Sequence, residues 1–272
     1  MSRPRRAGDA AGRSADRFRG WRMVAFAAVM LGLTGPGQTL GVSAFVDPMM
    51  AALDLTRSEV SAAYLVGTLI ASTALPGVGR VLDVRGTRRT LLVVAVALAV
   101  ALTAMSAVAG VVTLALGFIG IRMFGQGSLS LIATNAVAPW FVRRRGFAIA
   151  VVTAVGASLI ALVPLLATWG IGRVGWRVMW IALGGLVAVV LVPIALRGFV
   201  DRPEDVGQRP DGDPGDESGG SGADGAAPAA TSPADAVPIP DAIATAVRRG
   251  HTRGEALRTP MLWALIGGAV AT

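Results

Sequence analysis

Six long stretches of this sequence carry almost no charged side chain, and they constrain the fold more than any other feature. They cover residues 21–45, 60–82, 91–106, 112–139, 146–169 and 178–196. A hydrocarbon core about 30 Å thick needs roughly 20 apolar residues in an α-helix. Residues 91–139 carry a single charge, and their length predicts two helices with a turn near Ala109 and Gly110. We therefore expect an all-α membrane protein built as a six-transmembrane-helix bundle.

The composition excludes several other classes of protein. Hydrophobic residues make up 53% of the chain and charged residues only 15%, whereas roughly 25% is usual in soluble domains. With no cysteine and one histidine, His251, the chain has neither thiolate nor histidine-cluster metal sites, and we expect no metal and no cofactor. The spans hold no paired carboxylates and no histidine beside a serine, so we do not expect an enzyme.

The arginines predict the topology. All 25 basic residues are arginines: seven lie in residues 1–22, four in the loop after the second span and three after the fourth, against three on the other side. By the positive-inside rule the N-terminus is cytoplasmic. Because the arginines are not gathered on one polar face with stacking aromatics, the net charge of +8 does not indicate a nucleic-acid partner. We expect a multi-pass protein of the inner (plasma) membrane, with the lipid bilayer as a partner.

The sequence predicts four segments. Residues 1–20 form a cytoplasmic tail and residues 21–197 the six-helix bundle. Residues 198–258 are rich in Gly, Pro, Ala, Ser and Asp, which predicts a disordered cytoplasmic linker. Residues 259–272 resemble the start of a truncated seventh span. Their apolar run, residues 261–272, has twelve positions and would rise only about 18 Å, which is too short to cross.

Arg122 is the one ionisable side chain deep within the predicted spans. Its insertion costs at least about 2.5 to 3.5 kcal/mol, so it must face the bundle interior or a wet cavity. Gln126 and Ser130 follow at i+4 and i+8 and share its helix face. Two interpretations stay open: the wall of a cavity that attracts anions, or an arginine satisfied by carbonyls and hydroxyls for structural reasons.

The first span predicts a bent helix, because it contains several glycines and Pro36. It also contains Thr34 and Gln38. Bent helices with polar groups near the midplane are common at transporter binding sites, although close helix packing alone explains the same residues. The candidates for a substrate cavity are Arg122, Gln126, Ser130, Gln38 and Thr34.

The loop between the second and third spans carries the most specific motif. Residues 79–89 read Gly-Arg-Val-Leu-Asp-Val-Arg-Gly-Thr-Arg-Arg. This resembles the loop motif of the major facilitator superfamily, although its basic residue after the aspartate is displaced to Arg85 and Thr87 stands where a basic residue is usual. The motif residues expected at a gate are Gly79, Asp83, Gly86, Arg88 and Arg89.

Other segments resemble one branch of that family. Residues 55–61, 140–146, 202–205 and 210–212 look like the monocarboxylate and oxalate/formate exchangers. No Gly-Pro pair follows Gly156, which counts against a classical drug antiporter. The resemblance implies two six-helix bundles, each built from 3+3 inverted repeats. It also implies that Asp83 pairs with Arg143, Arg144 or Arg145 and with a helix of the other half.

The function implied is secondary active transport, by alternating access, of a small organic anion such as a monocarboxylate or oxalate/formate, in the manner of an antiporter. The chain then resembles an N-terminal half, which needs the C-terminal six-helix half or a second chain as a partner. The alternatives are a non-transporting six-helix scaffold or regulatory partner, and a drug or metabolite efflux protein of the same superfamily.

Overall fold

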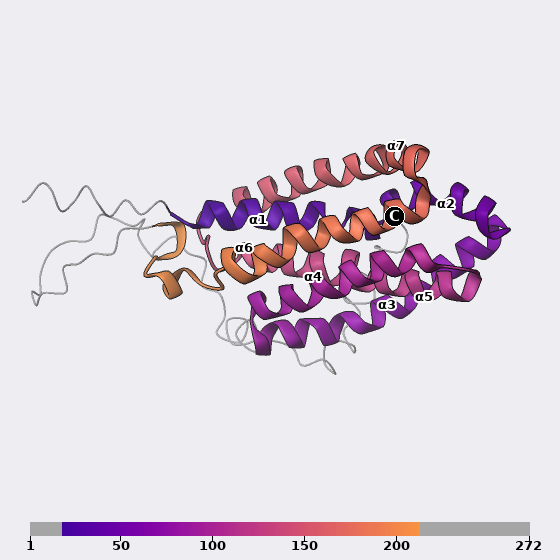
Figure 1. Ribbon diagram of the computed structural model, residues 1–272. Helices are drawn as coiled ribbons and strands as arrows, with labels where there is room; N and C mark the ends of the chain where they lie inside the picture. Colours follow the sequence, from indigo (N-terminus) through magenta and orange to yellow (C-terminus); the bar gives the residue numbers. More distant parts are fainter. Residues whose placement is uncertain (1–17, 213–272) are drawn as a thin grey trace, which may run out of the picture. The chain divides into compact units, whose positions relative to one another are not determined.

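The computed structural model describes residues 18–212, and all regular structure in this range is helical (Figure 1). Five segments are long and apolar enough to span a membrane: Gly20–Leu53, Arg57–Arg85, Thr87–Ala107, Val111–Val137 and Arg145–Gly198. The predicted all-α membrane class is thus confirmed, as is the turn near Ala109 and Gly110, since a helix starts at Val111. The predicted tail up to residue 17, the rest of the predicted linker from residue 213 and the predicted start of a seventh span lie outside the described residues.

The five segments are divided into shorter helices by local breaks. In chain order they are α1 (Gly20–Gly32), η1 (Gly35–Gly37), α2 (Thr39–Leu53), α3 (Arg57–Arg85), α4 (Thr87–Ala104), η2 (Met105–Ala107), α5 (Val111–Ile121), η3 (Arg122–Leu129), α6 (Ser130–Val137), α7 (Arg145–Pro193) and η4 (Ile194–Gly198). The bend predicted in the first span is the short 3₁₀ turn η1, which contains Pro36 between two glycines.

The helix α7 is interrupted at Gly175. Its 49 residues would extend about 74 Å as one straight helix, far more than a bilayer is thick. Gly175 has φ 81° and ψ 160°, a conformation that favours glycine, and the chain doubles back there (Figure 1). The break lies between the predicted spans 146–169 and 178–196, so α7 has two arms.

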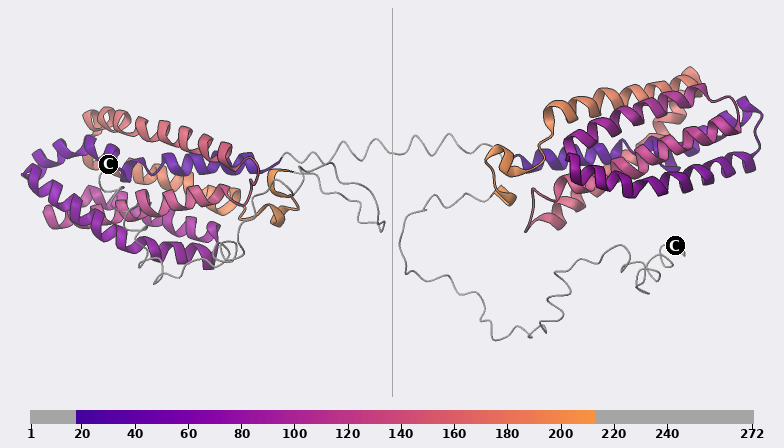
Figure 2. Two further views of the ribbon diagram at one scale, coloured as in Figure 1. Left: turned by 180° about the vertical axis from the view of Figure 1, so that it is seen from behind. Right: turned by 90° about the horizontal axis from the view of Figure 1, so that it is seen from below.

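The turns with clustered arginines lie at one end of the bundle. The start of α1, the turn from α3 to α4 and the loop from α6 to α7 meet there, and the break in α7 is at the opposite end (Figures 1 and 2). We call the end of the bundle where the start of α1 and these two turns meet the arginine-rich end. It contains both Arg85–Arg89 and the loop of residues 138–144.

The core is formed where α7 packs against α1, α2 and α4, and where α3 packs against α5. The rings of Phe45 and Trp180 stack at 4.0 Å and are both fully buried. A glycine brings α3 close to α5, since a Cβ on Gly67 would lie 2.7 Å from Cβ of Phe118. This close approach places Tyr64 and Thr68 of α3 near Arg122, which directly follows α5.

The sequence predicts a disordered segment that begins at residue 198, but the chain directly after η4 has defined structure. Within residues 199–212 it forms two short 3₁₀ turns, η5 (Pro203–Val206) and η6 (Pro210–Gly212). Phe199 and Pro203 are buried. The Gly- and Pro-rich composition does not reveal the specific polar contacts with the helix ends, which are described below. These contacts hold residues 199–212 in place.

Candidate functional site

Arg122 lies inside the bundle, where α5 ends and η3 begins. Its side chain is only 9% exposed, and Nη1 donates a hydrogen bond to Oε1 of Gln126. No carboxylate among residues 18–212 forms an ion pair with it. The guanidinium therefore introduces a positive charge that this part of the chain leaves uncompensated.

The residues around Arg122 form a π-helix rather than an α-helix. It runs from Arg122 to Leu129, and Oγ of the buried Ser128 donates a 2.7 Å hydrogen bond to the carbonyl of Met123. Such wide turns are rare and are frequent at functional sites. The wider turn also changes which residues share a helix face. Ser130, expected on the face of Arg122 and Gln126, does not line the pocket that those two residues share.

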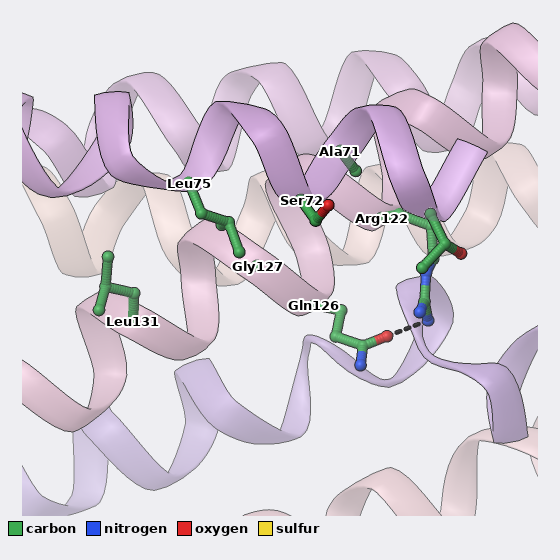
Figure 3. Close-up of a pocket in the computed structure, with 8 residues that line it drawn as sticks. Ala71, Ser72, Leu75, Arg122, Gln126, Gly127 and Leu131 are labelled. Atoms are coloured by element: carbon green, nitrogen blue, oxygen red, sulfur yellow. Dashed lines mark hydrogen bonds between the residues drawn. The ribbon is translucent and has the colours of Figure 1, made fainter. Parts of the chain in front are cut away.

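That pocket lies between α3 and η3 and has a volume of about 480 Å³ (Figure 3). This volume is within the usual range for small-molecule sites, roughly 300–1,000 Å³. Most of the wall is apolar. Its lining residues are Thr68, Ala71, Ser72, Leu75, Arg122, Gln126, Gly127 and Leu131.

Few hydrogen-bond donors remain free in this pocket. The hydroxyl of Thr68 donates to the carbonyl of Tyr64 at 2.8 Å, and that of Ser72 donates to the carbonyl of Leu69 at 2.7 Å. The side-chain donors left for a ligand are the guanidinium of Arg122 and the amide of Gln126, which point toward each other in Figure 3. An apolar wall with one cationic group suits a small anion.

Tyr64 supports Arg122 from α3. The guanidinium carbon lies 4.8 Å from the centre of the Tyr64 ring, and the Tyr64 and Thr39 hydroxyls share a 2.6 Å hydrogen bond. A cation over an aromatic face is attracted by the ring quadrupole. Sequence reasoning missed Tyr64, although it is the only tyrosine in the chain and lies in a predicted span.

Thr34 and Gln38 stabilise the break in the first span. The buried Thr34 hydroxyl donates to the carbonyl of Leu31 at 2.6 Å, and Nε2 of Gln38 donates to Oγ1 of Thr34 at 2.7 Å. Neither residue lines the pocket beside Arg122. In this structure their side chains satisfy polar groups at the bend.

The same bend packs tightly against the π-helix. A Cβ added to Gly37 would lie 2.4 Å from the carbonyl oxygen of Ile121 and 3.3 Å from Cα of Gly125. Only a residue without a side chain fits at this contact. The broken first span is thereby seated against the turn that carries Arg122.

At the arginine-rich end, Gly86 joins α3 to α4 with φ 78°, a region that favours glycine. Oδ1 of Asp201 accepts a 2.9 Å hydrogen bond from the backbone N–H of Arg88, in the first turn of α4. A Cβ on Gly86 would lie 3.1 Å from the other Asp201 oxygen. The glycine of the loop motif thus leaves room for a carboxylate that binds a free N–H group at a helix start.

The side chain of Arg88 connects the same turn to η4, which follows α7 directly. Its Nε donates to the carbonyl of Ala195 at 3.0 Å, and its Nη2 donates to the carbonyl of Leu196. Cations are stabilising at helix C-termini, where carbonyls lack intrahelical partners. One motif arginine therefore joins the start of α4 to the last turn of the bundle.

The other motif residues make fewer contacts. Within residues 18–212 the Asp83 carboxylate has no hydrogen bond or ion pair, and the side chain of Arg89 has none either. Gly79 faces open space, since a Cβ there would meet nothing within 4 Å. The expected pairing of Asp83 with the arginines of residues 143–145 is not formed in this structure.

Asp211 binds that second loop instead. Its carboxylate accepts hydrogen bonds from the backbone N–H groups of Val142 at 3.1 Å, Arg143 at 2.8 Å and Arg144 at 3.3 Å. Its own N–H donates to the carbonyl of Trp140 at 2.9 Å. Because Arg145 begins α7, this carboxylate lies at the start of α7 as Asp201 lies at the start of α4.

A third contact reaches the start of α1. The backbone N–H of Arg19 donates to Oε1 of Gln208 at 3.0 Å. Residues 199–212, which we call the capping segment, thus hold the starts of α1, α4 and α7 through Gln208, Asp201 and Asp211. The sequence analysis gave none of the three residues a structural role, and Asp211 entered it only within the family-like stretch 210–212, because all three lie where the composition predicts disorder.

The contacts of Asp211 also change its acidity. The backbone N–H of Arg143, followed by those of Arg144 and Val142 and by the nearby Arg143 charge, lowers the pKa of the Asp211 carboxyl below its ordinary value of 3.8. Hydrogen bonds to the charged form favour it, so Asp211 is ionised at neutral pH.

Among the described residues no group of three or more His, Cys, Asp or Glu side chains could hold a metal ion. The arrangement that remains is a bundle of apolar helices with one interior cation beside a pocket. Such a bundle defines a membrane protein with a largely apolar interior pocket that contains one cation.

Comparison with known proteins agrees with that class. Residues 23–272 match the sequence profile of the Major Facilitator Superfamily. A search of curated proteins finds no match. The chain therefore belongs to the major facilitator superfamily, whose members are membrane transporters, and it is a multi-pass membrane protein.

Proposed function

We propose that this protein is a secondary active transporter that moves a small organic anion by alternating access. The observation that carries the proposal is Arg122, a nearly buried cation that lines a pocket of about 480 Å³ and has no acidic partner among residues 18–212. An uncompensated intramembrane charge indicates a solute or ion site.

A carboxylate suits this site best among small anions. A guanidinium presents donors in a planar fork that matches the two oxygens of a carboxylate. Gln126 offers a further N–H₂ group beside it, because its Oε1 already accepts from Arg122. We therefore propose a monocarboxylate or oxalate/formate as substrate, with exchange as the mode of transport.

The proposed topology has six crossings with the N-terminus in the cytoplasm of the plasma membrane. It follows from the two arms of α7, which add a sixth apolar helix to the other four segments, and from the arginines clustered at one end. Alternating access then requires a second six-helix bundle, from this protein or another chain, to face the pocket.

Binding and transport are tested separately. Purified protein is heated in detergent with lactate, oxalate or formate, and a ligand that binds the folded state raises Tm. We expect at least one carboxylate to raise Tm for wild type, Arg122→Lys to retain part of the rise and Arg122→Gln to lose it. Arg57→Gln is the matched control, since Arg57 forms an exposed pair with Asp47 at 2.8 Å outside the pocket.

Uptake of the labelled carboxylate into vesicles then tests transport. Equal Tm shifts for wild type and Arg122→Gln would remove Arg122 from the site. A shift without uptake, even when a second bundle is supplied, would favour a solute-binding scaffold over a transporter.

A further inference from the structure

A second and larger cavity, unused by the proposed transport site, opens between α3, α4 and η3. It is a groove of about 670 Å³, and most of its wall is apolar. Val78 and Val81 of α3 and Val93 of α4 line it, and the side chains of Val81 and Val93 are exposed. Gly77 also lines the groove, and a Cβ there would meet nothing within 4 Å.

Two arginines lie at one end of this groove. Arg85 is the last residue of α3, and Arg89 lies in the first turn of α4 on the other side. Both side chains are exposed, and neither forms a hydrogen bond or ion pair with any of residues 18–212. The groove thus combines a long apolar wall with two unneutralised cations at its mouth.

We propose that this groove binds an anionic glycerophospholipid. The headgroup phosphate lies between the guanidinium groups of Arg85 and Arg89. One acyl chain lies along Gly77, Val78 and Val81, where the missing side chain of Gly77 deepens the groove.

The chemistry of the groove separates this ligand from the transported solute. The groove has exposed valines on two helices and its cations on the last residue of α3 and the first turn of α4, so an acyl chain laid along it gains free energy with each buried methylene. Basic pockets between transmembrane helices bind anionic headgroups at the cytoplasmic side of a membrane. The leaflet rests on the proposed topology, which places the arginine-rich end in the cytoplasm; the groove itself rests only on the bundle.

Native mass spectrometry of the detergent-purified protein titrated with phosphatidylglycerol or phosphatidylcholine tests the proposal. Wild type is expected to prefer phosphatidylglycerol. A basic residue near an anionic headgroup contributes about 1 kcal/mol, or about fivefold, so Arg85→Gln with Arg89→Gln lowers that affinity about thirtyfold. Gly77→Leu fills the groove while both arginines remain, and it also lowers the affinity.

Two matched controls separate a defined site from a diffuse charge effect. Arg80→Gln removes an exposed arginine of α3 that does not line the groove. Gly172→Leu adds the same bulk to α7, where a Cβ also meets nothing within 4 Å. Both are expected to bind phosphatidylglycerol as wild type does.

Three results would overturn the proposal. They are an unchanged phosphatidylglycerol affinity in the double arginine variant, an equal loss in Arg80→Gln, and displacement of the lipid by millimolar inorganic phosphate, which would indicate a site for free anions. Because the assay involves no transport, it can fail while the proposed function holds, and the reverse is also true.

Discussion

The carboxylate of Asp211 accepts a 2.8 Å hydrogen bond from the backbone N–H of Arg143, a residue 68 positions earlier in the chain. The same carboxylate binds the two neighbouring N–H groups, just before α7 begins. A helix start leaves N–H groups without partners, and a carboxylate there is favoured by both hydrogen bonds and the helix dipole. Asp211, which follows α7 in the chain, therefore stabilises the start of that same helix.

Removing this carboxylate should release the loop before α7. In Asp211→Ala, we expect amide hydrogen exchange at residues 142–144 to rise about tenfold or more, because local opening exposes N–H groups that Asp211 protected. Hydrogen-exchange mass spectrometry measures this directly. Asp83→Ala is the control, since Asp83 has no partner among the described residues. Unchanged protection in Asp211→Ala would show that the contact is not needed.

The Asp211 contact should also depend on pH. A carboxyl whose pKa is lowered on folding contributes stability above its unfolded pKa and loses that contribution as pH falls through the folded pKa. The contribution of Asp211 to the docking of the capping segment should therefore be constant at neutral pH and be lost only at acid pH, as pH falls through a pKa that the contacts lower below its ordinary value. The chain has no cysteine, so a spin label on the exposed Glu204→Cys reports the segment's mobility. Asp211→Asn, which has no ionisable group at this position, should lose the part of the transition that depends on Asp211.

Arg88 should contribute to the stability of the bundle in a way that its neighbours do not. Arg88→Met removes two hydrogen bonds to carbonyls of η4, and we expect a loss of about 1 to 2 kcal/mol, seen as a lower Tm. Arg80→Met changes an exposed arginine with no such contact and should leave Tm unchanged. Equal losses would mean that charge alone, rather than this contact, matters.

The fold was predictable because apolar length and charge placement decide it. The runs of residues 60–82 and 112–139 correspond to the segments Arg57–Arg85 and Val111–Val137, and the turn fell at the predicted glycine. Other features were not predictable. Residues 199–212 are held in place by partners far away in the chain, whereas amino-acid composition indicates only the local conformational preference of a segment.

Gly37 tests the contact between the bend and the π-helix. A methyl group at Gly37→Ala would approach the Ile121 carbonyl to 2.4 Å, and we expect a loss of about 1 to 3 kcal/mol from this overpacking. Gly172→Ala, where the added atom meets nothing, should be neutral or slightly stabilising, since alanine favours helix. Thermal unfolding in detergent compares the two. Equal Tm values for both variants would contradict the close approach.

Tyr64 tests how Arg122 is held. Tyr64→Phe keeps the aromatic face under the guanidinium but loses the hydrogen bond to Thr39, whereas Tyr64→Leu loses both. If a carboxylate raises Tm through Arg122, the rise should be largely kept in Tyr64→Phe and reduced in Tyr64→Leu, by about 0.5 to 2 kcal/mol in binding free energy. Similar losses in both variants would assign the role to the hydroxyl.

The candidate site was only partly predictable. Arg122 and Gln126 are four residues apart, and the structure joins them because a single turn keeps them on one side. Ser130 follows a π-helix that no local pattern indicates, and it leaves the pocket. Tyr64 comes from another helix, so no spacing rule within one span could have paired it with Arg122.

The capping segment also changes where the polypeptide departs from the bundle. Fourteen residues in extended form would reach roughly 46 to 50 Å, whereas residues 199–212 are held against the helix starts by hydrogen bonds. A force applied at Gly212 would act, through the carboxylate of the neighbouring Asp211, on the start of α7. The described chain therefore ends in a segment that is held at the starts of three helices, α1, α4 and α7, rather than at the end of η4 alone.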